Sequence, residues 1–179
     1  MLLLQLCQDP SELRLNQGEV IANRMRLVLS KSMPIEIINH TVSPCDEVAI
    51  VSLAQFVIKE MGVHPDSELS ISCVDEDEMT SLHIQWMNEP GPTDVLSFPM
   101  DEIKPNSAAN GPGLIGDIVL CPTVAAKQAD DANHSTQSEM ELLTTHGILH
   151  LLGYDHAIAN EEEIMFAVQN ELLVKWRNK

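Results

Sequence analysis

The stretch H-G-I-L-H-L-L-G-Y-D-H runs from His146 to His156 and says more about this protein than any other segment. Histidines four residues apart on a helix lie on one face, so His146 and His150 can both point at one metal ion. Gly153 can take the left-handed conformation that ends a helix and turns the chain back. That turn brings His156 to the same point. Three imidazoles with a fourth position open form the ligand set of a catalytic zinc site rather than a closed structural one.

A single histidine on an apolar helix is usually a hydrogen-bonded core residue, but three of them with a glycine at the turn are hard to explain by packing. Zinc is the expected ion, one per chain, and nickel, copper and manganese remain alternatives. The offsets also match H-E-x-x-H-x-x-G-x-x-H of the metzincin peptidases, in which the glutamate is the general base. Gly147 stands in place of that glutamate, which argues against an ordinary protease.

Two further segments, P-T-D-V-L-S-F-P at 92–99 and G-D-I-V-L at 116–120, accompany the histidine stretch. Together the three segments resemble the bacterial YbeY family, and the match extends from about Met33 to the end of the chain. Members of that family are described as zinc-dependent, single-strand-specific endoribonucleases that act in 16S rRNA 3′-end maturation and ribosome quality control. The resemblance implies that the three histidines are zinc ligands and that the substrate is single-stranded RNA or an rRNA precursor. It also implies the small ribosomal subunit or assembly proteins as partners.

One departure from the family concerns an arginine that many YbeY-like sequences carry shortly before the P-T-x-V-L-S-F-P segment, and that is thought important for RNA cleavage. Gln85 or Met87 occupies the expected place, and no arginine occurs between Arg26 and Arg177. A guanidinium grips a phosphate bidentately, which neither side chain can do. The departure therefore bears on nuclease efficiency more than on metal binding. Three lysines that the sequence does not place could compensate, namely Lys59, Lys104 and Lys127.

The composition is that of one soluble, cytoplasmic globular domain. The chain has 179 residues, of which 44% are hydrophobic, enough for a proper core. No apolar run reaches the length of a membrane span, and no signal peptide or disulfide framework is indicated. The formal charge of −17 runs against phosphate neutralisation, the usual basis of RNA affinity. A local patch, the metal's charge or a protein partner must then attract RNA.

Residues 1–32 differ in character, because their net charge is +1 against −18 for the remainder. The YbeY-like pattern begins at Met33. We expect that Met33 is the natural start or that residues 1–32 are an extension, with a YbeY-like metal-dependent hydrolase domain at 33–179. Apolar residues support a short helix around 18–30.

Apolar periodicity from Met33 onward predicts a single α+β domain with a small, mostly four-stranded mixed sheet and about five helices. The strands are expected at 35–39, 69–74, 94–98 and 114–120. The helices are expected at 43–62, at 75–88, from 122, from 138 and from 160. The fourth is a zincin-like metal helix, and residues 101–113 form a loop. Prolines on both sides of 94–98 indicate an edge strand.

Three helix starts are predicted from cap patterns: Ser43-Pro44, a Ser138/Glu141 capping box and an Asn160/Glu163 pair. The last helix shows an apolar residue at every fourth position. These four residues are Ile164, Val168, Leu172 and Trp176.

Other polar residues are candidates for supporting roles around the metal or the substrate. Asp155 either orients a histidine ligand from behind, a role metal sites commonly need, or simply forms the turn. Asp117 lies in an apolar strand and is expected to give structural support, for example by bonding the metal helix. Thr93, Asp94 and Ser97 either line a substrate groove or end the strand. His40, His64, His83 and His134 are not expected to act in chemistry.

Three functions therefore stand side by side: a zinc-dependent endoribonuclease, a metal-binding ribosome-assembly factor that cuts RNA weakly or not at all, and a zinc peptidase. The histidine triad and the resemblance of the three segments support the first, which is the expected function. The missing arginine and the acidic charge favour the second as the alternative, whereas Gly147 disfavours the third.

Overall fold

The computed structural model describes residues 34–179. Its sheet has four strands in the order β1-β2-β4-β3, and their bounds are β1 Ile35–Asn39, β2 Glu68–Cys73, β3 Val95–Pro99 and β4 Leu114–Leu120. The α-helices of this part are α2 Glu47–Glu60, α3 Glu76–Met87, α4 Pro122–Ala132, α5 Thr136–Leu151 and α6 Ala159–Arg177. A short 3₁₀ turn, η2, covers Ala108–Asn110. The α+β architecture with a four-stranded mixed sheet is confirmed.

The sheet is mixed because β1, β2 and β4 run parallel whereas β3 pairs with β4 antiparallel. β3 lies at one end of the strand order, so the prediction of a proline-bracketed edge strand is confirmed. Pro99 is its last residue, where a missing N–H costs an edge strand little.

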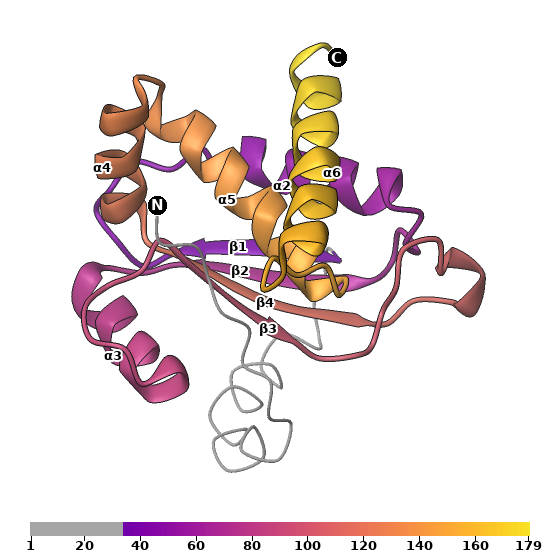
Figure 1. Cartoon of the computed structure of the whole chain (residues 1–179), viewed down its shortest axis with the longest axis horizontal. Helices are drawn as coiled ribbons and strands as arrows, with labels where there is room; N and C mark the ends of the chain where they lie inside the picture. Colours follow the sequence, from indigo (N-terminus) through magenta and orange to yellow (C-terminus); the bar gives the residue numbers. More distant parts are fainter. Residues whose placement is uncertain (1–33) are drawn as a thin grey trace.

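Helices cover the two faces of the sheet unequally. Figure 1 shows α2, α4, α5 and α6 on one face and α3 alone on the other. α5 contacts β3, β4, α2, α4 and α6, so it is the central element of the helical layer. No helix of residues 34–179 has the length and apolar character needed to cross a bilayer.

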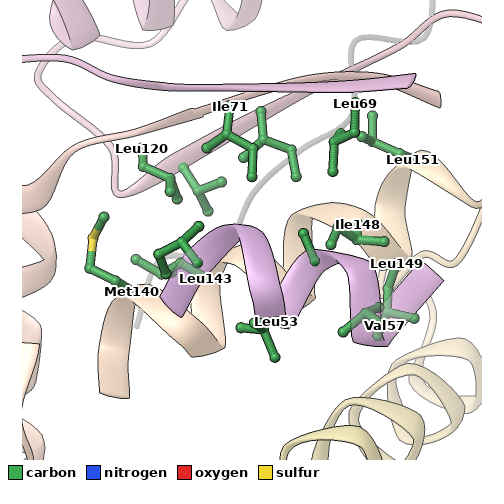
Figure 2. Packing of buried hydrophobic residues seen from close by; sticks show 14 of the residues in the cluster. Leu53, Val57, Leu69, Ile71, Leu120, Met140, Leu143, Ile148, Leu149 and Leu151 are labelled. Atoms are coloured by element: carbon green, nitrogen blue, oxygen red, sulfur yellow. The ribbon is translucent and has the colours of Figure 1, made fainter. Parts of the chain in front are cut away.

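The hydrophobic core lies between the sheet and the helices α2 and α5. Figure 2 shows Leu69, Ile71 and Leu120 of the sheet facing Leu143 and Ile148 of α5. All five side chains are at most 2% exposed. Burial of this apolar surface fixes the position of α5, and with it the position of the histidines that α5 carries.

Two glycines permit close packing, Gly147 of α5 against the sheet and Gly116 of β4 against β3. A Cβ on Gly147 would lie 3.0 Å from Ser97 Oγ and 3.1 Å from Ile118 Cδ1, so the helix approaches the sheet closely here. Gly116 has φ +144°, and a Cβ there would collide with the carbonyl oxygen of Phe98. Any L-residue at 116 would therefore be strained as well as crowded.

The predicted helix starts require three corrections. α2 begins after Asp46, whose Oδ1 accepts the Ala49 N–H at 2.9 Å, and not at Ser43-Pro44. α5 begins after Ser135, whose Oγ accepts the Ser138 N–H at 3.1 Å. Several Ser and Asp residues lie near each helix start. The residue that caps the helix is the one whose side chain accepts a hydrogen bond from the backbone N–H three residues later.

The start of the last helix also differs from the prediction. α6 is preceded by Ile158, which makes no side-chain cap, so Asn160 lies inside the first turn. The predicted apolar stripe is wrong in part, because Ile164 is 49% exposed. The buried face is instead Met165, Gln169, Leu172 and Leu173. Because an α-helix has 3.6 residues per turn, residues spaced strictly by four drift around the helix, and not all of them can lie on one buried face.

The remaining element predictions agree with the structure. The helix expected at 75–88 has Asp75 as its N-cap and Asn88 as its C-cap, and Pro122 is the first residue of α4. The helix expected at 18–30 and the extension at 1–32 lie outside the described residues.

Asp117 lies next to a residue of β4 that faces α5. Its neighbour Ile118 faces α5 at Gly147, and successive residues of a strand point to opposite faces. Asp117, which is half-buried, therefore lies on the face of the sheet away from α5. The expected role of Asp117 in structural support stays a prediction.

Candidate metal centre

Three histidines converge at the C-terminal end of α5. His146 and His150 lie one helical turn apart on α5, and Gly153 takes φ +88° immediately after the helix. The chain then reverses, and His156 returns to the same place. One ligand nitrogen of each histidine lies within 4.8 Å of the other two. The convergence predicted from the spacing is present.

Hydrogen bonds fix the orientation of the two helical imidazoles. His146 Nδ1–H donates to Gln169 Oε1 of α6 at 2.9 Å, and His150 Nδ1–H donates to the Tyr154 carbonyl at 3.0 Å. Because each Nδ1 faces an acceptor, the proton of each neutral ring sits on Nδ1. Both Nε2 atoms therefore present lone pairs.

These lone pairs face one another. His146 Nε2 and His150 Nε2 are 3.0 Å apart, and with both protons on Nδ1 this contact cannot be a hydrogen bond. His156 Nε2 is also buried and has no hydrogen-bond partner among residues 34–179. A shared cation satisfies all three nitrogens at once, so the donor set fits a metal ion that imidazole favours, such as Zn²⁺.

Burial keeps the helical histidines neutral. It lowers the pKa of His146 to about 4 and that of His150 to about 3, and for His150 the neighbouring histidines add to the effect. The hydrogen bonds from Nδ1 oppose the shift only partly. At neutral pH both rings are therefore unprotonated, which is the state that a metal requires.

Phe166 of α6 forms an apolar wall beside the histidines. Its ring stacks on His156 with the centroids 6.2 Å apart, and its centroid is 6.3 Å from that of His146. Phe166 therefore contributes apolar surface next to two of the three imidazoles.

Asp155 forms a hydrogen bond with the backbone of His156, one of the three candidate metal ligands. Its Oδ1 accepts the His156 N–H at 2.7 Å, which holds the turn that delivers His156. Of the two interpretations, the structure places Asp155 at the turn, and the orienting groups behind His146 and His150 are Gln169 and the Tyr154 carbonyl.

Position 147 cannot carry a catalytic side chain in this packing. A Cβ on Gly147 would lie closer to Ser97 and Ile118 than ordinary van der Waals contact, so the sheet fills the space that a longer side chain needs. The absence of the metzincin glutamate is therefore coupled to the close contact between α5 and the strands β3 and β4.

The residues near β3 mainly hold the strand and the helices together. Asp94 is 3% exposed and accepts hydrogen bonds from Val95 N, Thr93 Oγ1 and Gln128 Nε2. Ser97 is 4% exposed, and its Oγ donates to the Gly147 carbonyl at 3.4 Å. These contacts agree with the strand-ending interpretation for Asp94.

The other histidines lie apart from the three. The His83 ring bonds the Gly91 carbonyl, His64 Nδ1 accepts the Asp66 N–H, and His40 is exposed. His134 pairs with Glu139 at 2.7 Å, and burial of Glu139 raises the pKa of its carboxyl.

The positions expected for the family arginine lie on α3. Gln85 is exposed and Met87 is half-buried, and α3 is on the face of the sheet opposite α5 (Figure 1).

Sequence reasoning missed Gln169, Phe166 and the Tyr154 carbonyl. Gln169 carried a signal, because it sits four residues after Met165 and three before Leu172 on the buried face of α6. A polar residue at such a position needs a partner inside the protein. The carbonyl of Tyr154 carried none, since every residue has one.

Fold and site together define a class of protein: an α+β domain whose helix presents two histidines to a third on the following turn. The family model described as Endoribonuclease YbeY matches residues 36–177. Curated relatives called Endoribonuclease YbeY include the protein of Thermobifida fusca, 54% identical over 147 residues, covering 81% of this chain and 95% of that one. The protein of Acidothermus cellulolyticus is 55% identical over 151 residues, with coverages of 81% and 92%.

Among solved structures, the solution structure of TM1509 from Thermotoga maritima aligns with a TM-score of 0.56 and 27% identity. The alignment covers 80% of this chain and 92% of that one. The chain belongs to the YbeY endoribonuclease family.

Proposed function

We propose that this protein is a zinc-dependent endoribonuclease that cleaves single-stranded RNA in the 3′-end maturation of 16S rRNA and in ribosome quality control. The observation that carries the proposal is the convergence of three imidazole nitrogens, two of them facing each other at 3.0 Å as lone-pair donors. Membership of a family whose curated relatives are called endoribonucleases gives the reaction class.

His146, His150 and His156 would hold the ion, one per chain. A zinc ion bound by neutral histidines supplies a water molecule acidified to a pKa of roughly 7 and a Lewis acid for a phosphoryl oxygen. In residues 34–179 the cluster has three ligand side chains rather than four, which is the pattern of catalytic rather than structural zinc sites.

The protein's own groups prepare this site. Gln169 and the Tyr154 carbonyl hold the Nδ1 protons of two histidines, so Nε2 of both rings would be available to bind the ion. Phe166 contributes apolar surface on one side, and Asp155 holds the backbone of His156. Preorganisation of this kind reduces the reorganisation needed during reaction.

The substrate and setting follow from the same proposal. The partners are single-stranded RNA or an rRNA precursor and the small ribosomal subunit or its assembly proteins, in the cytoplasm. The functional unit is residues 33–179, consistent with a family match at 36–177. A chain starting at Met33 should retain metal binding and cleavage.

A second function is favoured by specific observations. The formal charge of −17 and the absence of arginine between positions 26 and 177 weaken the grip on phosphate. These features favour an assembly factor that binds metal and cuts RNA weakly or not at all. A zinc peptidase is disfavoured by Gly147, which sits against the sheet.

The test is incubation of the zinc-loaded protein with end-labelled single-stranded RNA that carries an rRNA 3′ tail. His150→Ala should abolish cleavage, whereas His40→Ala, a change of an exposed histidine away from the site, should not. If the wild type binds zinc but leaves RNA intact, the assembly-factor function replaces the nuclease. Cleavage that persists in His150→Ala would remove the metal from the mechanism.

A further inference from the structure

A lysine ammonium group lies against the loop that joins the histidines. Lys104 belongs to the segment between β3 and β4, and its Nζ is 2.7 Å from the point that a Cβ on Gly153 would occupy. Gly153 follows α5 between His150 and His156, and its N–H donates to the His150 carbonyl at 2.9 Å. Segments some fifty positions apart in the sequence therefore meet beside the candidate metal centre.

The segment that carries Lys104 is tied to its surroundings on both sides. Asn106 N–H donates to the Met61 carbonyl at 2.8 Å, and Ala108 N–H donates to the Gly62 carbonyl at 2.9 Å. Asp101 Oδ2 accepts the Leu114 N–H at 2.8 Å. The backbone around Lys104 is thus held between the end of α2 and the start of β4, which limits the positions that its ammonium group can reach.

The charge of Lys104 is available for a ligand. Three other cations of the described chain have partners: Lys127 pairs with Glu76, Lys175 with Glu60 and Glu171, and Lys179 lies over two aromatic rings. Lys104 forms no ion pair with another residue in the range 34–179. It is exposed, as is Gly153, so a ligand can reach the ammonium group from solvent.

We propose that Lys104 binds a backbone phosphate of the RNA strand that crosses the metal loop, and so positions the neighbouring phosphodiester at the three histidines. This role rests on the proposed function. A polyanion must find local positive charge on a chain whose formal charge is −17, because phosphate contacts supply most sequence-independent affinity. An ammonium beside the metal loop, unpaired within the described chain, meets that need. Gly153 contributes by lacking a Cβ, which leaves room for the lysine.

The experiment compares zinc-loaded wild type, Lys104→Ala and Lys104→Arg, with Lys127→Ala as the matched loss of one exposed charge away from the site. Affinity for a short fluorescent 2′-O-methyl single strand is measured by anisotropy over a range of salt concentrations. We expect Lys104→Ala to weaken binding about tenfold, the scale of a lost charge-assisted hydrogen bond. The slope of log affinity against log salt should fall by about 0.7, one phosphate contact on a single strand.

Cleavage kinetics and zinc content separate this role from a structural one. Lys104→Ala should raise KM for RNA more than it lowers kcat, keep its zinc, and be largely rescued by Lys104→Arg. If the wild type binds RNA and Lys104→Ala has the same salt slope as Lys127→Ala, the role of Lys104 is wrong while the nuclease proposal stands. If the wild type neither binds nor cuts RNA, the proposed function fails and this role fails with it.

Discussion

Replacing Gln169 by leucine tests whether the hydrogen bond behind His146 tunes the metal site. Gln169 is 6% exposed, and its Oε1 accepts the His146 Nδ1–H at 2.9 Å. Leucine fills a similar volume but removes the acceptor, so the Nδ1–H is left buried and unpaired, at a cost of about 1–3 kcal/mol. Loss of such a partner typically weakens metal affinity about 10- to 100-fold, or about 1.4–2.7 kcal/mol.

The assay is competition for Zn²⁺ between the protein and a chromophoric chelator at neutral pH. Asn170→Leu is the matched control, because this neighbouring amide on α6 is exposed and should leave the affinity unchanged. Gln169→Glu restores an acceptor and should recover most of the wild-type affinity. The reasoning is refuted if Gln169→Leu binds zinc as tightly as Asn170→Leu while remaining folded by circular dichroism.

Three further predictions follow from the geometry. His150→Ala removes a converging nitrogen and should weaken zinc binding by more than about 100-fold, beyond the loss of a supporting partner; equal zinc content after dialysis would contradict this. Gly116→Ala places a Cβ against the Phe98 carbonyl at φ +144° and should destabilise the fold by about 3 kcal/mol in urea. Gly111→Ala, at φ +88° with open space around it, should cost only about 1–2 kcal/mol, and equal losses would refute the role of the collision. The metal-free protein should lose stability as the pH falls from about 6.5 toward 4. In the unfolded chain, imidazoles take up protons near pH ~6.5. In the folded protein, the pKa values of His146 and His150 are about 4 and 3, so the folded state binds fewer protons in this range. Urea midpoints at several pH values would show this window, and a double His→Gln variant of the two histidines that loses as much stability would contradict it.

Much of the fold could be predicted because local patterns coincided with the tertiary outcome. The strand at 35–39, the strand at 114–120 and the edge position of β3 all follow from alternation and proline placement. Prediction failed where several residues of the same type competed locally. Ser135 and Ser138 are equally good caps in isolation, and only the packing of α5 in the helical layer decides where its first turn begins.

Within the candidate site, the sequence by itself determined the converging histidines, because helical periodicity and a glycine at the turn are local properties. It could not determine which groups lie behind and beside them. Gln169 reaches His146 from α6, twenty-three positions later, and Lys104 reaches Gly153 from the segment between β3 and β4. Those neighbours depend on how α6 and the segment after β3 pack against α5, and such packing is set by the burial of the whole core rather than by any one segment.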